Sequence, residues 1–229
     1  EESFVAQDIS VWKGGEKIYL PRLSNRLPGI NHFKMGPVPH SLFSRRSPKI
    51  PFVRFPAWLF CAKCRRMVRF RPDDERPGEA PVCQSCRAQN KNMTLTPMRF
   101  VLVCENGHMD DVDWKYWSHS KPENQTQKQC RDYSNLKFMS RAGMGGGLES
   151  VIVQCETCKA KRSLHQIVSK DVMNSIGLRC PGRQPWQSRQ IAQDCDCVPQ
   201  VVQRGASNVY YPVTVSALDI SSSEAAEEV

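Results

Sequence analysis

The sequence predicts an α+β fold built from small β-hairpin modules of the zinc-ribbon type, with a few short helices. Three observations support this prediction. Most of the 11 cysteines lie in closely spaced pairs, the apolar runs are short and rich in β-branched and aromatic residues, and only two segments have a helical pattern. In a zinc ribbon, hairpin turns carry paired cysteines and the bound metal holds those turns together.

The composition is that of a folded protein without a membrane-spanning segment. Of the 229 residues, 40% are hydrophobic and 24% are charged, which is ordinary for a globular chain. No apolar run approaches the roughly 20 residues needed to cross a bilayer, so no membrane partner is expected. The odd number of cysteines and their paired spacing argue against a secreted disulfide framework. Because thiols stay reduced in the cytosol, we expect a cytoplasmic protein.

We expect three parts along the chain: an N-terminal approach segment (1–50), a zinc-binding body (51–200), and a strand and linker (201–229) toward a further C-terminal region. The approach segment is rich in proline, which argues against long helices there. Short strands are expected where apolar or β-branched residues alternate or run beside a cysteine pair, at 8–12, 17–20, 67–70, 98–103, 151–153 and 209–215.

Two helices are expected in the body. The first opens at Asp110 and Asp111, because carboxylates stabilise a helix N-terminus. The second spans 163–176, where Ser163 can cap the start, apolar residues recur at helical spacing, and Gly177 ends the helix.

The strongest motif is a pair of cysteine knuckles. Cys61-x2-Cys64 is followed, after 18 residues, by Cys83-x2-Cys86. The two-residue spacing lets both sulfurs of a knuckle reach one ion, and two knuckles complete a tetrahedron. Since the protein fills all four positions, no position is open for water, and we expect a structural zinc ion.

A second ribbon is expected from Cys155-x2-Cys158 together with Cys180 and Cys195. Only one knuckle is present, so this pattern is looser than the first. Cys197 lies two residues beyond Cys195 and is the alternative fourth ligand, although a cysteine there can also be an ordinary small apolar residue.

A third site is expected from Cys104-x3-His108 with Cys130. His119 is the candidate fourth ligand. That role stays open because a helix over 111–119 would place it about 12 Å along the axis from the helix start. The sequence therefore predicts two to three structural zinc ions, with iron as the main competitor for thiolate ligands.

No catalytic constellation stands out, and we expect a protein that is not an enzyme. The alternative is a metal-dependent nuclease that uses Asp110, Asp111 and Asp113 beside His108, because phosphoryl chemistry uses carboxylate-held Mg²⁺. Acidic residues at a helix start have a simpler role, and no second carboxylate cluster is evident. No Walker-type phosphate loop is present.

The formal net charge of +9 favours an acidic partner, of which nucleic acid is the usual one. Basic residues gather just beyond two of the knuckles, and we expect them to contact phosphates; they are Arg65, Arg66, Arg69, Arg71, Lys159, Lys161 and Arg162. Trp58, Phe60 and Phe70 lie nearby and can either stack on bases or belong to the core.

Four stretches together resemble the N-terminal part of the DrmB family, a component of the bacterial DISARM anti-phage system. They are 54–61 (RFPAWLFC), 99–111 (RFVLVCENGHMDD), 180–186 (CPGRQPW) and 203–212 (QRGASNVYYP). Their order and spacing match the family from about residue 50 to residue 220, whereas the first 50 residues match only vaguely.

The resemblance implies an accessory subunit of a DNA helicase in phage defence. The implied partners are the DISARM helicase DrmA and DNA, with phage DNA as the target of the complex. It assigns no DNA-contacting residues, so the basic clusters are a hypothesis from charge alone. The alternatives are a structural adaptor that docks on the helicase without touching DNA, and the nuclease described above.

Overall fold

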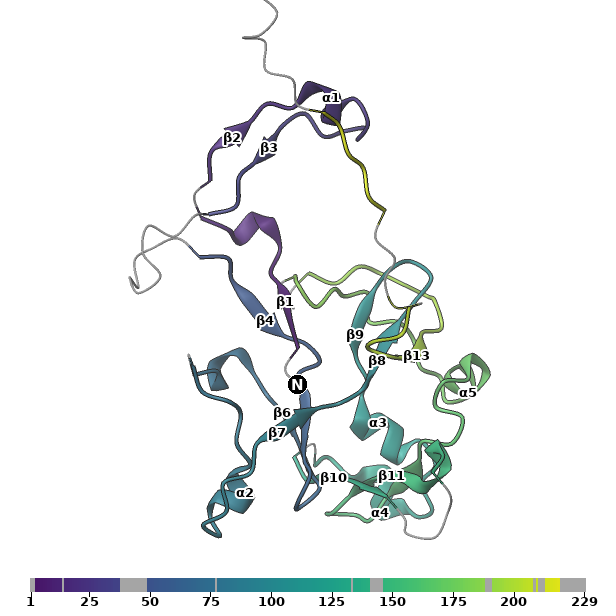
Figure 1. Ribbon diagram of the computed structural model, residues 1–229. Coiled ribbons are helices and arrows are strands. Elements are labelled where there is room, and N and C mark those ends of the chain that lie inside the picture. Colours follow the sequence, from purple (N-terminus) through teal and green to yellow (C-terminus); the bar gives the residue numbers. More distant parts are fainter. Residues whose placement is uncertain are drawn as a thin grey trace, which may run out of the picture. The chain divides into compact units, whose positions relative to one another are not determined.

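The computed structural model describes residues 3–13, 15–37, 49–76, 78–132, 134–140, 146–187, 191–207, 209 and 213–218. The chain divides into two compact units (Figure 1). The larger unit comprises Glu1–Ala6 and Phe52–Val209, and the smaller one comprises Gln7–Pro51 and Tyr210–Val229.

In the smaller unit, β2 (Lys17–Ile18) pairs with β3 (Phe33–Lys34) in an antiparallel hairpin. The short helix α1 (Pro21–Ser24) lies between them. The strand expected at 17–20 is therefore present as the shorter β2. The prediction of a strand at 8–12 is wrong, because this segment forms the 3₁₀ helix η1 (Ile9–Val11) instead. Asp8 caps that helix by accepting a hydrogen bond from the Ser10 N–H.

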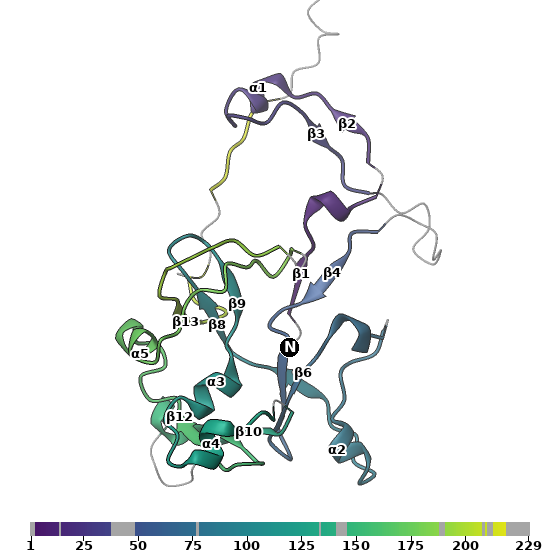
Figure 2. The same ribbon diagram turned by 180° about the vertical axis from the view of Figure 1, so that it is seen from behind.

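The main feature of the larger unit is a six-stranded antiparallel sheet with the order β12-β11-β10-β6-β5-β7. Figure 2 labels β12, β10 and β6 of this sheet. Its strands are β5 (Trp58–Cys61), β6 (Arg66–Arg69), β7 (Leu95–Pro97), β10 (Leu136–Ser140), β11 (Val151–Cys155) and β12 (Lys161–Ser163). The β5–β6 and β11–β12 hairpins each carry one cysteine knuckle. The strand β10 joins the two hairpins, because it pairs with both β6 and β11.

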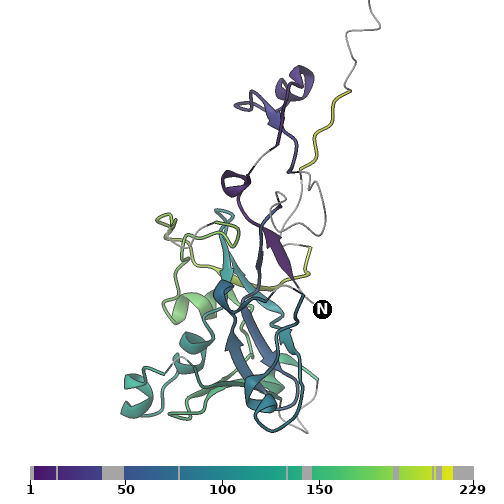
Figure 3. The same cartoon turned by 90° about the vertical axis from the view of Figure 1, so that its left-hand side faces the viewer.

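A second sheet has the order β13-β8-β9, with β8 (Phe100–Val103), β9 (Met109–Asp111) and β13 (Gln200–Gln203). The pairing of β13 with β8 is antiparallel and places Gln200 opposite Val103. The chain just before β13 therefore lies beside the chain just after β8. A separate ribbon pairs β1 (Phe4–Ala6) with β4 (Phe52–Arg54), seen as purple and blue strands in Figure 3.

The strands expected at 67–70, 98–103 and 151–153 are confirmed as β6, β8 and β11. Of the strand expected at 209–215, residues 210–212 lie outside the described residues, and 213–215 form no strand.

Both predicted helices begin later than expected. Asp110 and Asp111 lie in β9, and α3 (Trp114–His119) starts after Asp113, whose side chain accepts from the Tyr116 N–H at 2.9 Å. Because β9 pairs with β8, the two aspartates lie in a strand and do not begin a helix.

Ser163 likewise belongs to β12, and Ser169 caps the shorter helix α5 (Lys170–Ser175). The other helices are α2 (Gln84–Arg87) and α4 (Gln125–Gln129), with 3₁₀ turns η2 (Pro72–Asp74) and η3 (Leu148–Ser150). In the described part of the chain, no helix has the length and apolar character that crossing a membrane requires.

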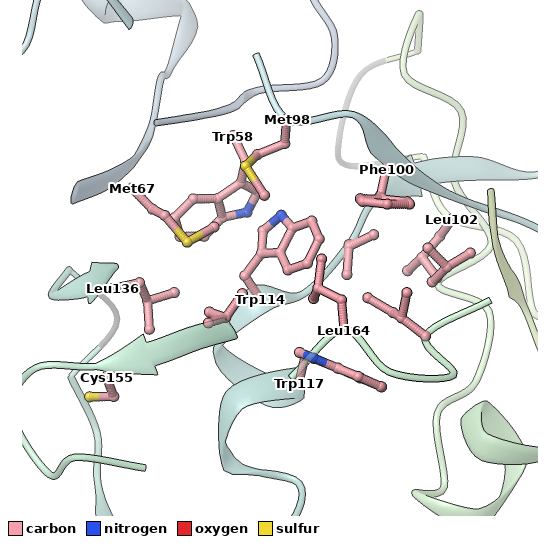
Figure 4. Packing of buried hydrophobic residues seen from close by; sticks show 14 of the residues in the cluster. Trp58, Met67, Met98, Phe100, Leu102, Trp114, Trp117, Leu136, Cys155 and Leu164 are labelled. Carbon is pink, nitrogen blue, oxygen red and sulfur yellow. The ribbon is translucent and has the colours of Figure 1, made fainter. Parts of the chain in front are cut away.

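The core of the larger unit is built around two tryptophans of α3 (Figure 4). Trp114 and Trp117 are 0% and 2% exposed, and α3 packs against β11 and β12. The Phe100 ring meets the Trp114 ring edge-on, with centroids 6.4 Å apart. Trp58 is also buried in this cluster, so its role is packing rather than base stacking.

Candidate metal centres

Two hairpin turns of the six-stranded sheet share one knuckle geometry. In the first, Arg65 has φ +63° and its N–H donates to the Cys61 carbonyl at 2.9 Å. In the second, Lys159 has φ +62° and its N–H donates to the Cys155 carbonyl at 2.9 Å. This left-handed residue closes the turn so that the two sulfurs of each knuckle face the same side.

Centre I consists of Cys61, Cys64, Cys83 and Cys86, whose sulfurs all lie within 4.8 Å of one another. The Cys61–Cys86 sulfurs are 3.7 Å apart and the Cys64–Cys83 sulfurs are 3.5 Å apart. Four sulfurs at about 2.3 Å from a tetrahedral ion would be about 3.8 Å apart. A disulfide would require about 2.05 Å. The geometry fits a metal ion and not a disulfide.

The second half of centre I is a tight turn around α2. Cys83 immediately precedes this helix, its N–H donates to the Met93 carbonyl at 2.8 Å, and the Lys91 N–H donates to the Cys86 carbonyl at 3.0 Å. Leu59 and Leu95 pack beside the thiols. This small apolar cluster keeps the ligand atoms away from solvent.

The thiols of centre I differ in their acidity. Burial opposes ionisation of Cys61, but N–H donors from Cys64 and Lys63 outweigh it and lower its pKa to about 7. Burial and the three neighbouring thiols raise the pKa of Cys86 to about 12. Four thiols this close cannot all ionise without a cation between them, which is the electrostatic condition that a divalent ion satisfies.

Centre II consists of Cys104, His108, Cys180 and Cys195, again within 4.8 Å of one another. Cys104 and His108 flank the β8–β9 turn, where Gly107 has φ +75°. Cys180 and Cys195 lie on the segment before β13. The Cys104 sulfur is 3.4 Å from His108 Nδ1 and 4.0 Å from the Cys195 sulfur.

Groups outside the four ligands orient centre II. His108 Nε2 lies 3.2 Å from the Gln193 side-chain oxygen, so its N–H donates there and Nδ1 faces the sulfurs. N–H groups of Gly182 and Asn106 donate to the Cys180 and Cys195 sulfurs at 3.4 Å and 3.5 Å. These contacts resemble the second shell of a metal–thiolate site.

The thiols of centre II also differ in acidity. The backbone N–H of Cys197 is the main cause that lowers the pKa of Cys195 to about 6. Burial raises the pKa of Cys180 to about 12. Of these two thiols, Cys195 therefore ionises first.

Centre III consists of His119, Cys130, Cys155 and Cys158. His119 ends α3, where its Nδ1–H donates to the Lys115 carbonyl at 2.8 Å and its Nε2 lies 3.2 Å from the Cys158 sulfur. Cys130 follows α4, and its sulfur is 3.9 Å from that of Cys155. Burial raises the pKa of Cys158 to about 11.

All twelve expected ligands fall into these clusters, but two of the three groupings expected from the sequence are wrong. Cys180 and Cys195 lie with Cys104 and His108, not with the Cys155 knuckle. The reason is sheet topology, since the β13–β8 pairing carries the segment before Gln200 past the turn after Val103. Along the chain, the ligands of centre III lie between the two halves of centre II, so these two centres are nested rather than consecutive.

The structure places the two ligands that the sequence left open, His119 and the choice between Cys195 and Cys197. His119 belongs to a cluster, but to that of Cys130 with the Cys155 knuckle, because α3 is short and ends against β11 and β12. Cys195 rather than Cys197 lies in centre II. Cys197 instead contributes its carbonyl, which accepts from the Cys180 N–H at 3.0 Å.

Some of the basic residues beside the knuckles pack against aromatic rings, and others lie at the surface. The Arg65 guanidinium donates to the Phe138 carbonyl at 2.8 Å and stacks on the Phe60 and Phe138 rings. Arg162 lies 3.9 Å from the Trp117 ring centroid, and burial lowers its pKa. Both side chains are engaged in packing. Lys159 contacts Glu156 at 3.8 Å, and Lys161 is exposed.

Arg66, Arg69 and Arg71 line a groove of about 1180 Å³ in the larger unit, which we call the arginine groove. Its charged lining residues are seven arginines and five carboxylates, namely Arg66, Arg69, Arg71, Arg76, Arg87, Arg179, Arg183, Asp74, Glu79, Asp110, Asp111 and Asp113. No local pattern in the sequence singles out Arg76, Arg87, Arg179 and Arg183, because long-range folding brings them together.

The acidic residues considered for a nuclease have local structural partners. Asp113 caps α3, and both oxygens of Asp111 accept from the Ala57 N–H, at 3.0 Å and 3.3 Å. Burial and the neighbouring Asp110 raise the pKa of Asp111 to about 6. His108 is held within centre II.

Comparison with known proteins gives two matches. Residues 1–211 match the model of a family described as "Domain of unknown function (DUF8724)". The chain is also similar to the DISARM protein DrmB of Bacillus paralicheniformis, with 29% identity over 231 residues that cover 96% of this chain. The matched region is 36% of that protein, so the chain spans about a third of the length of this curated relative.

Proposed function

We propose, from the premise that this chain belongs to the DUF8724 family, that it is the metal-scaffolded part of an accessory subunit in a DISARM-type anti-phage defence system. The observation that carries the proposal is the similarity to DrmB over 96% of the chain. The three clusters lie within the aligned region and, with a metal ion in each, would cross-link the fold.

The proposed metal is zinc, one ion in each centre. Centre I offers four cysteines, and centres II and III each offer three cysteines and one histidine, which are donor sets of structural zinc sites. With four protein ligands at each ion, no position is left for water or substrate. The ions would therefore hold chain segments together rather than take part in a reaction.

We assign no catalytic activity to this chain. His108 faces the sulfurs of centre II, and Asp113 and Asp111 accept hydrogen bonds from backbone N–H groups. A nuclease would need these groups to be available for a catalytic ion and a water. Their present roles favour structure over catalysis.

The subunit is proposed to act in the cytoplasm together with a helicase, corresponding to DrmA, and to contribute to DNA binding by the complex. The net charge of +9 and the arginine groove support this role. The competing function is a structural adaptor whose basic surface meets an acidic face of the helicase.

Fluorescence anisotropy across a salt series, with and without the helicase, separates these functions. We expect the chain to bind DNA, or to tighten binding by the complex, with log K falling linearly as log salt rises. A chain that joins the helicase without changing its DNA affinity would be an adaptor. A chain that neither joins the helicase nor binds DNA would contradict the proposal. Mg²⁺-dependent cleavage of plasmid DNA by the purified chain would restore the nuclease alternative.

A further inference from the structure

The arginine groove collects positive charge from distant parts of the chain. Arg66, Arg69 and Arg71 come from β6 and the segment after it, Arg87 comes from α2, and Arg179 and Arg183 flank Cys180. The groove thus brings together residues about 120 positions apart, and no local charge run predicts it.

The groove arginines differ from other cations of the larger unit in what they contact. Arg54 pairs with Glu75 at 2.7 Å, and Lys137 pairs with Glu156 at 2.9 Å. By contrast, none of the seven groove arginines forms an ion pair with another described residue. Arg183 Nε is also buried without a hydrogen-bond partner in the described part of the chain. The groove therefore holds guanidinium N–H groups that pair with no carboxylate among the described residues.

The five carboxylates offset part of the positive charge of the groove but do not outweigh it, and backbone N–H groups orient most of them. Asp111 accepts from Ala57, Asp113 from Tyr116, and Asp110 from the next residue at 2.7 Å. Asp74 accepts from the Arg71 N–H at 2.8 Å. Arg76 and Arg179 donate to nearby carbonyl and amide oxygens, which carry no charge. The seven guanidinium groups of the groove exceed its carboxylates by two.

Segments that carry two of the metal centres line this space. Cys83 of centre I lines it directly, and so do Arg179 and Arg183, which flank Cys180 of centre II. The Met109 N–H donates to the Arg183 carbonyl at 3.0 Å, which ties that segment to β9. The backbone that carries these arginines is thereby held in place, so binding costs little backbone entropy.

We propose that the arginine groove binds a single-stranded nucleic acid through its phosphodiester backbone. The planar guanidinium fork matches phosphate oxygens better than an ammonium does. A concave groove admits a flexible strand, whereas a duplex carries its phosphates on the outside of a wide cylinder. Phe70 is half-buried in the lining and has the Arg54 guanidinium 5.5 Å from its ring centroid, so phosphate contacts rather than base stacking carry the assignment. This assignment rests on the proposed function and gives it a site.

The test compares two charge-reversed proteins. Arg71→Glu, Arg87→Glu and Arg179→Glu alter exposed groove residues, and Arg99→Glu, Lys121→Glu and Lys128→Glu make the same change in charge at exposed residues outside it. The probe is a labelled oligothymidylate, measured by anisotropy from 50 to 200 mM salt. Metal content and circular dichroism verify folding, and a groove triple Arg→Gln variant repeats the test without charge reversal.

We expect the groove variant to lose at least tenfold in affinity and to lower the salt slope by about 2, as the loss of three phosphate contacts to a single strand predicts. The control should change less than about threefold. Wild-type protein should bind the single strand several-fold more tightly than a duplex of equal length. Equal losses in both variants, or none in the groove variant, would overturn the assignment.

The outcomes also separate this assignment from the proposed function. If wild-type protein binds DNA and the groove variants bind equally well, the groove assignment fails while the DNA-binding function stands. If wild-type protein fails to bind DNA both alone and with the helicase, the DNA-binding function fails as well. Tighter binding of polyglutamate than of oligothymidylate would identify the groove as a protein-docking site and overturn the assignment.

Discussion

Arg65 and Phe138 join the two cysteine ribbons by a reciprocal pair of hydrogen bonds. The Phe138 N–H donates to the Arg65 carbonyl at 2.8 Å, and the Arg65 guanidinium donates back to the Phe138 carbonyl at 2.8 Å. Because Arg65 closes the centre I knuckle and Phe138 lies on β10, this contact connects centre I to the strand that pairs with β11 of centre III. The backbone conformation of Arg65 therefore shapes the centre I knuckle and also allows the hydrogen bonds to Phe138 that join the two hairpins.

Arg65→Ala should destabilise the protein by about 2 kcal/mol, because it removes a charge-assisted hydrogen bond and two cation–π contacts. Urea denaturation measures this cost. Lys63→Ala, an exposed change in the same knuckle, should stay within about 0.5 kcal/mol of wild type. Equal midpoints for the two variants would show that the Arg65 side chain does not hold the hairpins together.

Double serine substitutions test the nested grouping of ligands. Cys104→Ser with Cys180→Ser should remove one metal ion, because both residues belong to centre II. Cys104→Ser with Cys130→Ser should remove two, because these residues belong to different centres. Metal analysis of the purified variants gives the count, and Cys197→Ser should lose none. The reverse pattern would support the consecutive grouping expected from the sequence.

Gly182 and Gly107 form a matched pair of glycines near centre II. Both have positive φ, +63° and +75°, but only at Gly182 would a Cβ meet another group, the Gln193 carbonyl oxygen at 1.7 Å. Gly182→Ala should therefore displace the segment that carries the His108 partner and lower metal occupancy of centre II. Gly107→Ala should cost about 1 kcal/mol from backbone strain and keep the metal. Equal occupancy in both variants would contradict this.

Asp111 gives the protein a specific pH dependence. Its folded-state pKa of about 6 lies above the ordinary value of about 3.9, so the folded state binds more protons between these values. The free energy of unfolding therefore falls as pH rises through this window. Asp110 raises this pKa and Arg69 opposes the rise.

Asp111→Asn keeps an acceptor for the Ala57 N–H and removes the titration. Relative to wild type, the variant should gain on the order of 2 kcal/mol between pH 4.5 and pH 7.5. Urea midpoints at these two pH values provide the measurement. A stability difference that does not change with pH would rule out this role for Asp111.

Local patterns in the sequence identified the ligand residues, but outside centre I they did not predict correctly which of those ligands share a centre. Ligand type and spacing are local properties, so Cys61, Cys64, Cys83 and Cys86 could be grouped correctly from the sequence. Centres II and III combine segments whose proximity is set by strand pairing. In β10–β11, Leu136 lies opposite Cys155, which brings Cys130 toward that knuckle, and no spacing rule contains this information.

The same limit explains the helix and charge predictions. Asp110 and Asp111 resemble a helix start, but pairing with Leu102 and Val101 in β8 places them in a strand. The basic residues near the knuckles looked equivalent, yet Arg65 and Arg162 pack against aromatic rings while Arg69 lines the groove. Side-chain environment, rather than sequence position, separates packing arginines from available ones.

We propose that three zinc ions hold the larger unit together. Inductively coupled plasma mass spectrometry of the purified protein, with the protein concentration determined independently, tests this directly. We predict three zinc ions per chain, and removing them with a strong chelator should abolish the folded circular dichroism signal, since each structural zinc contributes on the order of 10 kcal/mol. A folded protein that contains no metal, or one whose colour and metal content identify iron, would contradict it.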